Sequence, residues 1–403
     1  MNLDYLSEIT VIDMTEGVAG PYAASMLGDM GANVIKVERA AGDWSRTAGQ
    51  SIDSPKGSPQ FIALNRNKRD ISVEVDTPEG YAVLSRMISR ADVVLSNFRA
   101  GVMDKLRLGY THCEALQAKI IYCTISGFGQ QGPYANFPAS DTILQALSGM
   151  MNQVGETEGP PLRVGFPLID ITAAHHAVQA ILLALLGRVT GKDSSGKKID
   201  ISLIATALGL MNVSFTDFLI TGKLPQKHGN QNAAHAPAGA FKTKEGAYIT
   251  IAILRDSHWK KFCQCIERPD LTQDPRFTSN ALRIKNREPL NELIATIIGL
   301  HSSDVWLEKL HHADILCGPI QSFRDIAANQ HLTKILPLVN PHLPGIEKIY
   351  GNPIHWDDQF FDIKRSAPVR GQHTREILIE LEYSQEEIEQ LLTSGSLFQA
   401  PHP

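Results

Sequence analysis

The sequence predicts an α/β protein in which helices cover a mostly parallel sheet. Short runs rich in β-branched residues alternate with segments of helical periodicity over residues 9–125, which is the pattern of parallel strands joined by crossover helices. The chain has 403 residues, of which 43% are hydrophobic and 20% are charged, a composition typical of a globular protein. A chain of this length is expected to form two or three domains, each with its own core.

The first elements form a strand–helix–strand unit. Residues 9–14 are a short β-branched run, residues 21–30 have the apolar spacing of a helix, and residues 33–37 form a second short run. Gly31 and Ala32 end the helix between the two runs. We therefore expect two parallel strands joined by a crossover helix.

The same alternation continues further along the chain. In residues 77–91, a threonine N-cap, a first-turn proline and a first-turn acid precede an apolar helical face. Residues 92–96 and 119–125 have the composition of strands. These elements extend the predicted sheet.

The pattern changes after residue 150. Residues 171–188 predict a long apolar helix, residues 199–203 predict a strand, and a second apolar helix is expected to end near residue 220. Residues 221–239 are rich in Gly, Pro, Asn, Gln and Ala without periodicity, which is typical of a linker. We therefore place a domain boundary at 222–240.

A small α+β unit is expected after this boundary. A strand at residues 247–253 precedes helices at residues 258–266, 288–300 and 304–312. The end of the chain also has ordered elements, because residues 374–382 predict a helix. Ser384 and Glu387 then form a capping box for a last helix.

Charge and cysteine content exclude several classes of function. The net charge of −5 leaves no general positive field for a nucleic acid or an anionic membrane. The most apolar run, residues 180–186, is too short to span a bilayer, and the N-terminal residues lack a targeting pattern. The five cysteines match neither a zinc pattern nor a redox pattern. We expect a cytoplasmic protein with reduced thiols, without a metal, a nucleic-acid partner or a membrane.

Three segments could bind an anion locally. Residues 15–21 place two glycines where backbone N–H groups could meet a phosphate, although a plain turn with proline at the first helical position explains the spacing equally well. Residues 64–69 combine three cations with two asparagines, but a solvated surface loop is the simpler interpretation. Residues 97–99 follow a strand, and the carboxyl ends of strands line the ligand crevice of an open α/β sheet.

Asp170 stands near the start of the long apolar helix. On residue chemistry alone, an N-cap explains it best. His175 and His176 point about 100° apart on a helix and have no carboxylate or cysteine at i+4, so a packed or hydrogen-bonded pair is favoured over a metal site. The chain contains no G-x-S-x-G, H-E-x-x-H or P-loop motif, which argues against the commonest hydrolases, zinc proteases and NTPases.

Several motifs, read together, strongly resemble those of the family III CoA-transferases, which include formyl-CoA transferase, carnitine CoA-transferase and alpha-methylacyl-CoA racemase. The similarity runs nearly end to end, and it is the common order of the motifs that carries it. The motifs are V-I-D-M-T-x-x-x-A-G-P-Y at 11–22, G-A-N-V-I-K-V-E-R at 31–39, L-N-R-N-K-R at 64–69, N-F-R-A-G at 97–101, S-G-F-G-Q-Q-G-P-Y at 126–134, Trp259, R-P-D-L-x-x-D-P-R-F at 268–277 and A-P-V-R-G-Q-H-T at 367–374.

The resemblance implies a two-domain architecture. A Rossmann-like large domain would contain residues 1–221 and, after a return linker, the C-terminal part of residues 326–403. The linker at 222–240 and a smaller α+β domain at 241–325 would lie between them. Relatives form an interlocked homodimer, so the same assembly is expected here.

The resemblance also implies site residues and substrates. The substrates would be coenzyme A, carried as an acyl-CoA donor, and a carboxylic acid acceptor, without a metal. Asp170 matches the catalytic aspartate of the relatives. The positions that match their CoA-binding residues are Gly17, Val18, Arg39, Asn65, Arg66, Asn67, Lys68, Arg69, Asn97, Phe98, Arg99 and Lys105.

In these relatives the aspartate attacks the donor thioester, forms an acyl-aspartyl anhydride, and then becomes an aspartyl-CoA thioester that the acceptor acid attacks. Such a site needs N–H donors for the oxyanion, and the N-terminus of the helix that carries Asp170 is expected to supply them. Asp170 would then combine the roles of cap and nucleophile.

Two departures limit the resemblance. Family racemases have a histidine base where this chain has Ser140, and serine cannot replace imidazole near neutral pH. Formyl-CoA transferases have a glycine-rich loop where this chain has residues 252–259, which disfavours oxalate and formate as substrates. Arg255 in that stretch could pair with a substrate carboxylate or form a surface salt bridge. A racemase and an inactive CoA-binding homologue are the alternatives.

Overall fold

The computed structural model describes residues 3–50, 52, 54 and 56–401. The first two residues of the N-terminal segment considered above lie outside this range. The described chain divides into two compact units. Residues 151–163 and 221–334 form the smaller unit, and the remaining described residues form the larger one.

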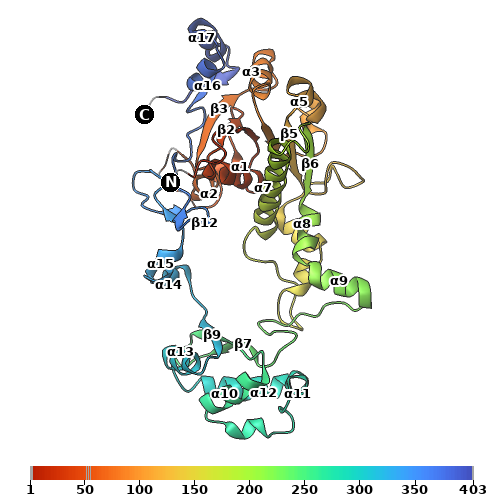
Figure 1. Ribbon diagram of the computed structural model, residues 1–403, viewed down its shortest axis with the longest axis vertical. Coiled ribbons are helices and arrows are strands. Elements are labelled where there is room, and N and C mark those ends of the chain that lie inside the picture. Colours follow the sequence, from red (N-terminus) through yellow and green to blue (C-terminus); the bar gives the residue numbers. More distant parts are fainter. Residues whose placement is uncertain (1–2, 51, 53, 55, 402–403) are drawn as a thin grey trace. The chain divides into compact units, whose positions relative to one another are not determined.

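The larger unit contains a seven-stranded sheet in the order β14-β3-β2-β1-β4-β5-β6 (Figure 1). All neighbouring pairs are parallel except β14 with β3. The order β3-β2-β1-β4-β5-β6 is that of doubly wound nucleotide-binding folds, so the predicted α/β class is confirmed. The strands are β1 (Thr10–Met14), β2 (Asn33–Glu38), β3 (Lys68–Val73), β4 (Val93–Ser96), β5 (Ile121–Ser126), β6 (Lys197–Ser202) and β14 (Leu397–Phe398).

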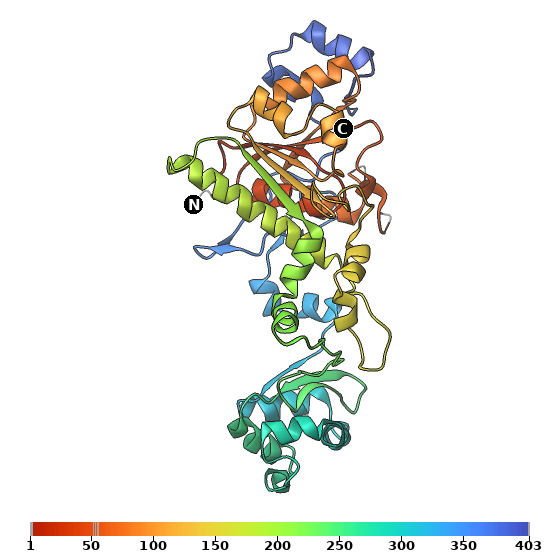
Figure 2. The same cartoon turned by 90° about the vertical axis from the view of Figure 1, so that its right-hand side faces the viewer.

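Helices cover both faces of this sheet because neighbouring strand residues point to opposite faces. Val11 joins the core beneath α1 and α7, whereas Ile12 joins the core beneath α3, α5, α16 and α17. Figure 2 shows α7 running along the sheet beside β6. The helices of the larger unit are α1 (Ala19–Asp29), η1 (Trp44–Thr47), α2 (Pro59–Leu64), α3 (Pro78–Ile88), α4 (Val102–Lys105), α5 (Tyr110–Leu116), α6 (Asp141–Leu147), α7 (Leu168–Val189), α8 (Leu203–Leu210), α9 (Asn212–Thr221), α16 (Thr374–Glu380) and α17 (Gln385–Thr393). Two short helices, η2 (Met150–Gln153) and α15 (Leu332–Ile335), lie mostly in the smaller unit.

The helix signals of the sequence are confirmed in α3 and α17. The Thr77 side chain accepts the N–H of Gly80 at the start of α3, and Ser384 and Glu387 form the expected capping box of α17. Two short hairpins, β10 (Leu338–Val339) with β11 (Ile349–Tyr350) and β12 (His355–Trp356) with β13 (Gln359–Phe360), precede these C-terminal helices.

Two predicted helices differ in the structure. The long apolar helix α7 begins at Leu168, three residues before the predicted start. The second apolar helix is two helices, α8 and α9, that meet at an angle of 78°. By length and composition α7 could cross a bilayer, and α8 with α9 could form a broken span. A mostly buried core helix passes the same test, and one side of α7 packs against the sheet.

The smaller unit is built on an antiparallel sheet in the order β7-β8-β9. Apolar side chains on one face of this sheet, such as Ile249 and Ile251, pack against Trp259 and Phe262. Residues 222–237 lie outside helices and strands, and β7 begins at the end of the expected linker. The elements are β7 (Ala238–Lys242), β8 (Tyr248–Ala252), α10 (Asp256–Cys265), η3 (Pro269–Thr272), α11 (Asn280–Lys285), α12 (Arg287–Ile298), α13 (Ser303–His312), β9 (Leu316–Pro319) and α14 (Phe323–Ala328).

Candidate active site

A cavity of about 370 Å³ lies in the larger unit, beyond the carboxyl ends of the parallel strands. β1 pairs with β2 on one side and β4 on the other, so the chain reverses its direction of winding there, and such a reversal opens a ligand crevice. Four predicted site residues line this cavity: Val18, Asn97, Arg99 and Asp170. Its other walls include Glu16, Trp44, Phe137, Ser140 and Asp141.

Asn97 joins the two loops that form one wall of the cavity. Its Oδ1 accepts the N–H of Glu16 at 3.0 Å, and its Nδ2 donates to the Glu16 carbonyl at 2.7 Å. The turn after β1 is therefore held against the segment after β4. Phe98 turns away and packs on the core beneath α3 and α5.

Gly17 occupies a position that requires glycine. Its φ is +85°, and a Cβ there would lie 2.5 Å from Cζ2 of Trp44, which is closer than real contacts allow. Its N–H donates to Oδ1 of Asp43 at 3.1 Å. Asp43 also caps η1, which begins with Trp44, so one carboxylate positions both the turn and the indole beside it.

Two buried lysines support this turn from inside the protein. Lys36 donates to the Thr15 carbonyl and to Asp43, while Lys68 donates to the Pro21 carbonyl and to Asp13. Burial alone would raise the pKa of Asp13, but the two ammonium groups hold it below its usual value. Burial lowers the pKa of Lys68 to about 8, against the effect of Asp13. Both ion pairs therefore remain charged at neutral pH.

The expected phosphate-binding segment, Asn65 to Arg69, lies in the interior. Arg66 pairs with Asp29 at 2.6 Å, and Asn67 donates to the same carboxylate. The Asn65 amide oxygen accepts from Lys68. Arg69 pairs with Glu376 and Glu380 on α16. The solvated-loop interpretation of this segment is wrong, because its residues are buried and β3 begins at Lys68. Its cations pair with protein carboxylates, and phosphate binding by this segment stays a prediction.

The other predicted cations are exposed. Arg39 lies 3.5 Å from the Glu16 carboxylate, with a side chain that is 60% exposed. Lys105 is exposed at the end of α4, and Arg99 is exposed at the cavity wall. α1 begins at Ala19, two residues before Pro21, so the proposed first-position proline is wrong.

Asp170 is the third residue of α7 and is not its N-cap. Pro167 holds the cap position and contributes no side-chain hydrogen bond. Asp141, the first residue of α6, takes over that role. Its Oδ2 accepts the N–H of Ile169 at 2.8 Å and the N–H of Asp170 at 3.2 Å. The cap interpretation of Asp170 is therefore wrong.

The start of α7 also lacks the expected oxyanion donors. The N–H groups of Ile169 and Asp170 are used by Asp141, and that of Leu168 donates to the Phe166 carbonyl. The backbone N–H groups of residues 168–170 therefore donate to other acceptors and not to the Asp170 carboxyl. Burial, followed by the charge of Asp141, raises the pKa of Asp170 to about 7.

The histidine pair on α7 is packed and hydrogen-bonded as predicted. The His175 ring lies edge-on against Tyr22, with ring centres 5.8 Å apart. Nδ1 of His176 lies 3.4 Å from Oγ1 of Thr206. In the part of the chain that the structure describes, no three His, Cys, Asp or Glu side chains form a group that could hold a metal ion.

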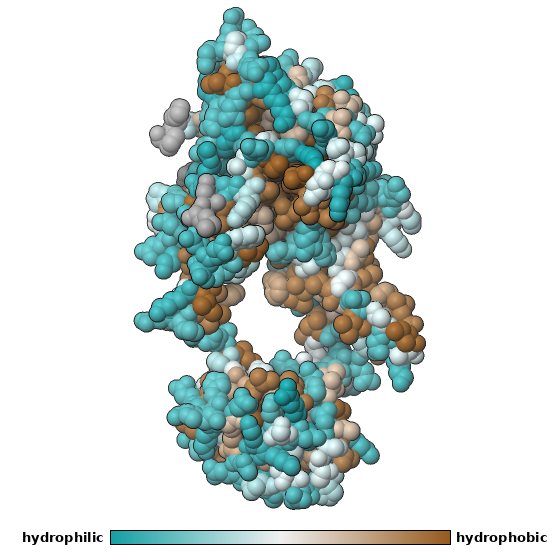
Figure 3. Space-filling model, in the orientation of Figure 1, coloured by the Kyte–Doolittle hydropathy of each residue, from teal (hydrophilic) through white to brown (hydrophobic). Residues whose placement is uncertain are grey.

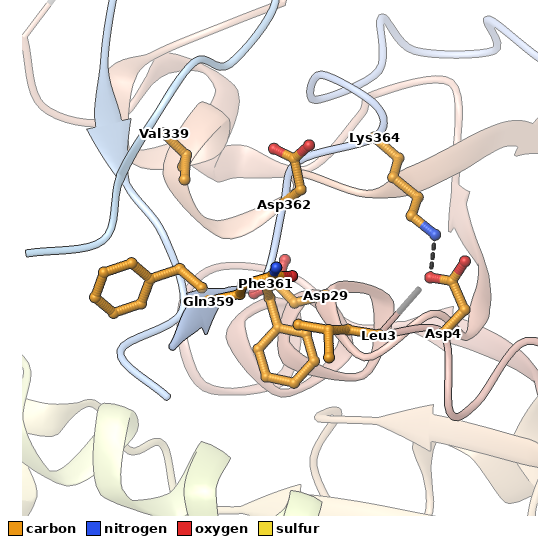
Figure 4. Close-up of a pocket in the computed structure, with 9 residues that line it drawn as sticks. Leu3, Asp4, Asp29, Val339, Gln359, Phe361, Asp362 and Lys364 are labelled. Atoms are coloured by element: carbon orange, nitrogen blue, oxygen red, sulfur yellow. Dashed lines mark hydrogen bonds and ion pairs between the residues drawn. The ribbon is translucent and has the colours of Figure 1, made fainter. Parts of the chain in front are cut away.

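A larger cavity of about 460 Å³ is lined by none of the predicted site residues. It lies between the N-terminal segment and the residues after β13 (Figure 4). Lys364 points to Asp4 in this cavity and forms an ion pair with it. Asp29, also in its wall, pairs with Arg66. The smaller cavity is the better candidate for chemistry, because it brings Asp170 together with Val18, Asn97 and Arg99.

Sequence reasoning missed Asp141 and Trp44 in that site. Ser140 caps α6, with Oγ 3.5 Å from the N–H of Ile143, and Ser-Asp is a recognisable helix start. That signal predicts α6, but its spacing does not reveal that the Asp141 carboxylate reaches another helix. Nothing local to Trp44 indicates its contact with Gly17.

Comparison with known proteins identifies relatives along nearly the whole chain. The sequence model of CoA-transferase family III matches residues 6–374. Succinyl-CoA:glutarate CoA-transferase of Mus musculus is 32% identical over 98% of this chain and 90% of its own length. Acetyl-CoA:oxalate CoA-transferase of Acetobacter aceti is 34% identical over 79% of this chain and 81% of its own length.

A solved structure has the same fold. The CAIB/BAIF family protein from Brucella suis superposes with a TM-score of 0.85, at 30% identity, over 94% of this chain and 99% of its own. The predicted resemblance is therefore confirmed by sequence and by structure. The chain belongs to CoA-transferase family III, and it is an enzyme of that family.

Proposed function

We propose that the protein moves CoA from an acyl-CoA thioester to a free carboxylic acid, with Asp170 as the covalent nucleophile. The observation that carries this proposal is the position of the Asp170 carboxyl. It lines the crevice at the carboxyl ends of β1 and β4 together with Val18, Asn97 and Arg99. The family acts on CoA thioesters, and its named members transfer CoA between carboxylic acids.

The reaction proceeds through covalent intermediates on one carboxylate. Ionised Asp170 attacks the thioester carbonyl, the C–S bond breaks, and an anhydride and the CoA thiolate form. The thiolate attacks the aspartyl carbonyl of this anhydride, which releases the donor acid as its carboxylate and leaves an aspartyl-CoA thioester. The acceptor carboxylate attacks that thioester and releases the thiolate. The thiolate then attacks the acceptor's carbonyl in the new anhydride, which gives the product acyl-CoA and regenerates Asp170 without net proton transfer.

CoA would be held at the crevice by the turn after β1 and the segment after β4. α1 starts at this turn without a side-chain cap, and Val18 and Ala19 line the cavity, so the positive end of α1 faces the ligand. Arg39, Arg99 and Lys105 supply exposed charge for the phosphates. Lys68 supports the turn from inside the protein, whereas Arg66 and Arg69 pair with protein carboxylates, so we base phosphate binding on the exposed cations.

A transferase is favoured over a racemase by the role of Ser140. Its hydroxyl caps α6, and a hydroxyl cannot remove an α-proton near neutral pH. Incubation of the enzyme with acyl-CoA in deuterated water distinguishes the two reactions. We expect no exchange at the α-carbon above the exchange measured without enzyme.

We further propose a homodimer with interlocked subunits. Large apolar side chains are exposed along α7, α8 and α9, and Figure 3 shows hydrophobic residues gathered over α8 and α9. Val189 is 85% exposed and Val213 is 84% exposed. Neighbouring exposed apolar side chains are typical of protein–protein interaction sites. Light scattering of the purified protein should give twice the chain mass of 44.2 kDa.

The covalent step is tested by trapping. We expect hydroxylamine to attack the aspartyl carbonyl of the anhydride or of the aspartyl-CoA thioester when the enzyme is incubated with an acyl-CoA. This attack leaves a hydroxamate on the side chain of residue 170 and releases the donor acid or CoA. Succinyl-CoA with glutarate is the first pair to try, because a named relative uses it. Asp170→Asn is the matched control, since it keeps the size of the side chain. A hydroxamate at another residue, or equal labelling of the variant, would overturn the assignment.

A further inference from the structure

The start of α7 is organised by a carboxylate from another helix. Asp141 is 8% exposed. Its Oδ2 accepts hydrogen bonds from two backbone N–H groups of α7. Its Oδ1 accepts a hydrogen bond from Nε2 of Gln145 at 2.6 Å. Oε1 of Gln145 in turn accepts the N–H of Val164 at 2.8 Å. The chain of hydrogen bonds runs from the segment before α7, through Gln145 and Asp141, to the backbone of Asp170.

In this arrangement the positive N-terminus of α7 interacts with the Asp141 carboxylate. The N–H groups at a helix N-terminus stabilise a nearby negative charge. If they donated to the Asp170 carboxylate, they would make it a weaker base and therefore a weaker nucleophile. Asp141 accepts them instead. The Asp170 carboxyl shares the cavity with a second negative charge, which disfavours its ionisation and increases its basicity.

We propose that Asp141, oriented by Gln145, is a positioning residue that occupies the N-terminus of α7, so that Asp170 is presented to the thioester as a basic, reactive carboxylate. Asp141 acts through Asp170 and forms no bond to substrate. The proposal rests on the proposed function of Asp170 as the nucleophile, and it adds the device that keeps this carboxylate reactive.

Other ionisable groups near Asp170 are few. Glu16 from the turn after β1 and Arg99 from the segment after β4 line the same cavity. On α7 itself, His175 lies more than one turn away, against Tyr22 of α1. α8, which packs against α6 and α7, carries no ionisable side chain. Asp141 is the ionisable residue whose side chain bonds the backbone of Asp170.

The test moves the charge while it preserves the hydrogen bonds. In Asp141→Asn, the amide oxygen can still accept the two N–H groups, but the new NH₂ faces the Gln145 donor. In the double variant Asp141→Asn/Gln145→Glu, the carboxylate introduced at position 145 accepts both this NH₂ and the Val164 N–H. The double variant keeps the net charge of the wild type and moves the negative charge away from Asp170.

The first readout is the titration of Asp170, measured by NMR of the full-length protein with ¹³C at aspartate carboxyls and assigned with Asp170→Asn. We expect the midpoint to fall by about one pH unit in Asp141→Asn, and to fall by less, in the same direction, in the double variant. The lower limb of the pH profile of kcat should move with it. An unchanged midpoint in both variants would overturn the proposal.

The second readout separates positioning from folding. The double variant should unfold at the same urea concentration as the wild type, with a several-fold lower kcat and an unchanged KM for acyl-CoA. A loss of stability without a shift in the titration would reduce Asp141 to a structural cap and reject the proposal. The NMR titration needs no turnover. A failure of the hydroxamate experiment would therefore overturn Asp170 as nucleophile without altering the measured effect of Asp141 on its ionisation.

Discussion

Asn97 bonds both backbone polar groups of Glu16, accepting its N–H and donating to its carbonyl. The two residues are 81 positions apart in the chain, yet they lie side by side because β1 and β4 are neighbours in the sheet. This pair of hydrogen bonds joins the two segments that line one side of the crevice in which we place CoA.

Loss of the Asn97 side chain should therefore weaken acyl-CoA binding. Two hydrogen bonds of about 1 kcal/mol each hold the turn, so we expect Asn97→Ala to raise KM for acyl-CoA about tenfold, with a smaller change in kcat. Asn97→Asp keeps the acceptor for the Glu16 N–H, but it turns a carboxylate oxygen toward the Glu16 carbonyl and adds a negative charge to the crevice. Steady-state kinetics should therefore give it a KM at least as high as that of the alanine variant, and equal KM values for the wild type and both variants would contradict this role.

The contact of Gly17 with Trp44 predicts a steric coupling. Gly17→Ala places a Cβ 2.5 Å from the indole at φ +85°, and we expect it to lower the free energy of unfolding by about 2 kcal/mol. Trp44→Ala removes the clash but not the backbone strain. Urea unfolding of both single variants and the double variant should therefore show that the second substitution recovers part of the loss. Strict additivity would show that the contact is unimportant.

The raised pKa of Asp170 predicts the pH dependence of the reaction. The nucleophile must be ionised, and burial together with the charge of Asp141 raises its pKa to about 7. The rate of hydroxamate formation should therefore increase with pH through about 7 and level off above it. A rate that is already at its maximum at pH 5 would mean that the carboxyl is ionised in its ordinary range.

The same shift predicts that the nucleophile costs stability. The folded state favours protonated Asp170 more than the unfolded state does, because its pKa rises from 3.8 to about 7 on folding. The cost is absent below pH 4, grows as the pH rises towards 7 and is complete above 7. Asp170→Asn should then be more stable than the wild type by about 4 kcal/mol at pH 8, and nearly equal to the wild type in stability at pH 4. Urea unfolding at the two pH values checks this difference.

The stability of the fold should depend on Lys68 and Asp13 together, because they form a fully buried ion pair beneath the turn. Lys68→Met leaves the buried Asp13 carboxylate without its partner, at a cost of about 3–5 kcal/mol. Asp13→Leu/Lys68→Met removes both charges and should recover most of this loss. A double variant that is less stable than Lys68→Met would show that the interior needs the charges themselves.

The order of strands and helices in the larger unit was readable from the sequence because each element has a strong local pattern. The β-branched run that includes Val11 and Ile12 predicts a strand, which the structure shows buried as β1. Thr77 starts α3 by an interaction within four residues. The parallel sheet then follows from the short connections between such elements.

The features that local patterns could not reveal depend on distant partners. Lys68 and Arg69 have the composition of a solvated loop, and only carboxylates on other elements allow them to lie inside a strand. The role of Asp141 likewise depends on the start of a helix 28 residues later. Asp170 was found by its match to the family, whereas its own surroundings suggested a cap that another residue provides.

The two lysines behind the turn after β1 also determine how a ligand is received. Lys36 donates to the carbonyl of Thr15 in the turn, and Lys68 donates to the carbonyl of Pro21 in the first turn of α1. Both ammonium groups are fully buried. Because these two hydrogen bonds already hold the backbone in place, it should lose little conformational entropy when a nucleotide binds. Association at this surface should therefore carry a small entropic penalty, and the affinity comes from contacts that need no prior rearrangement.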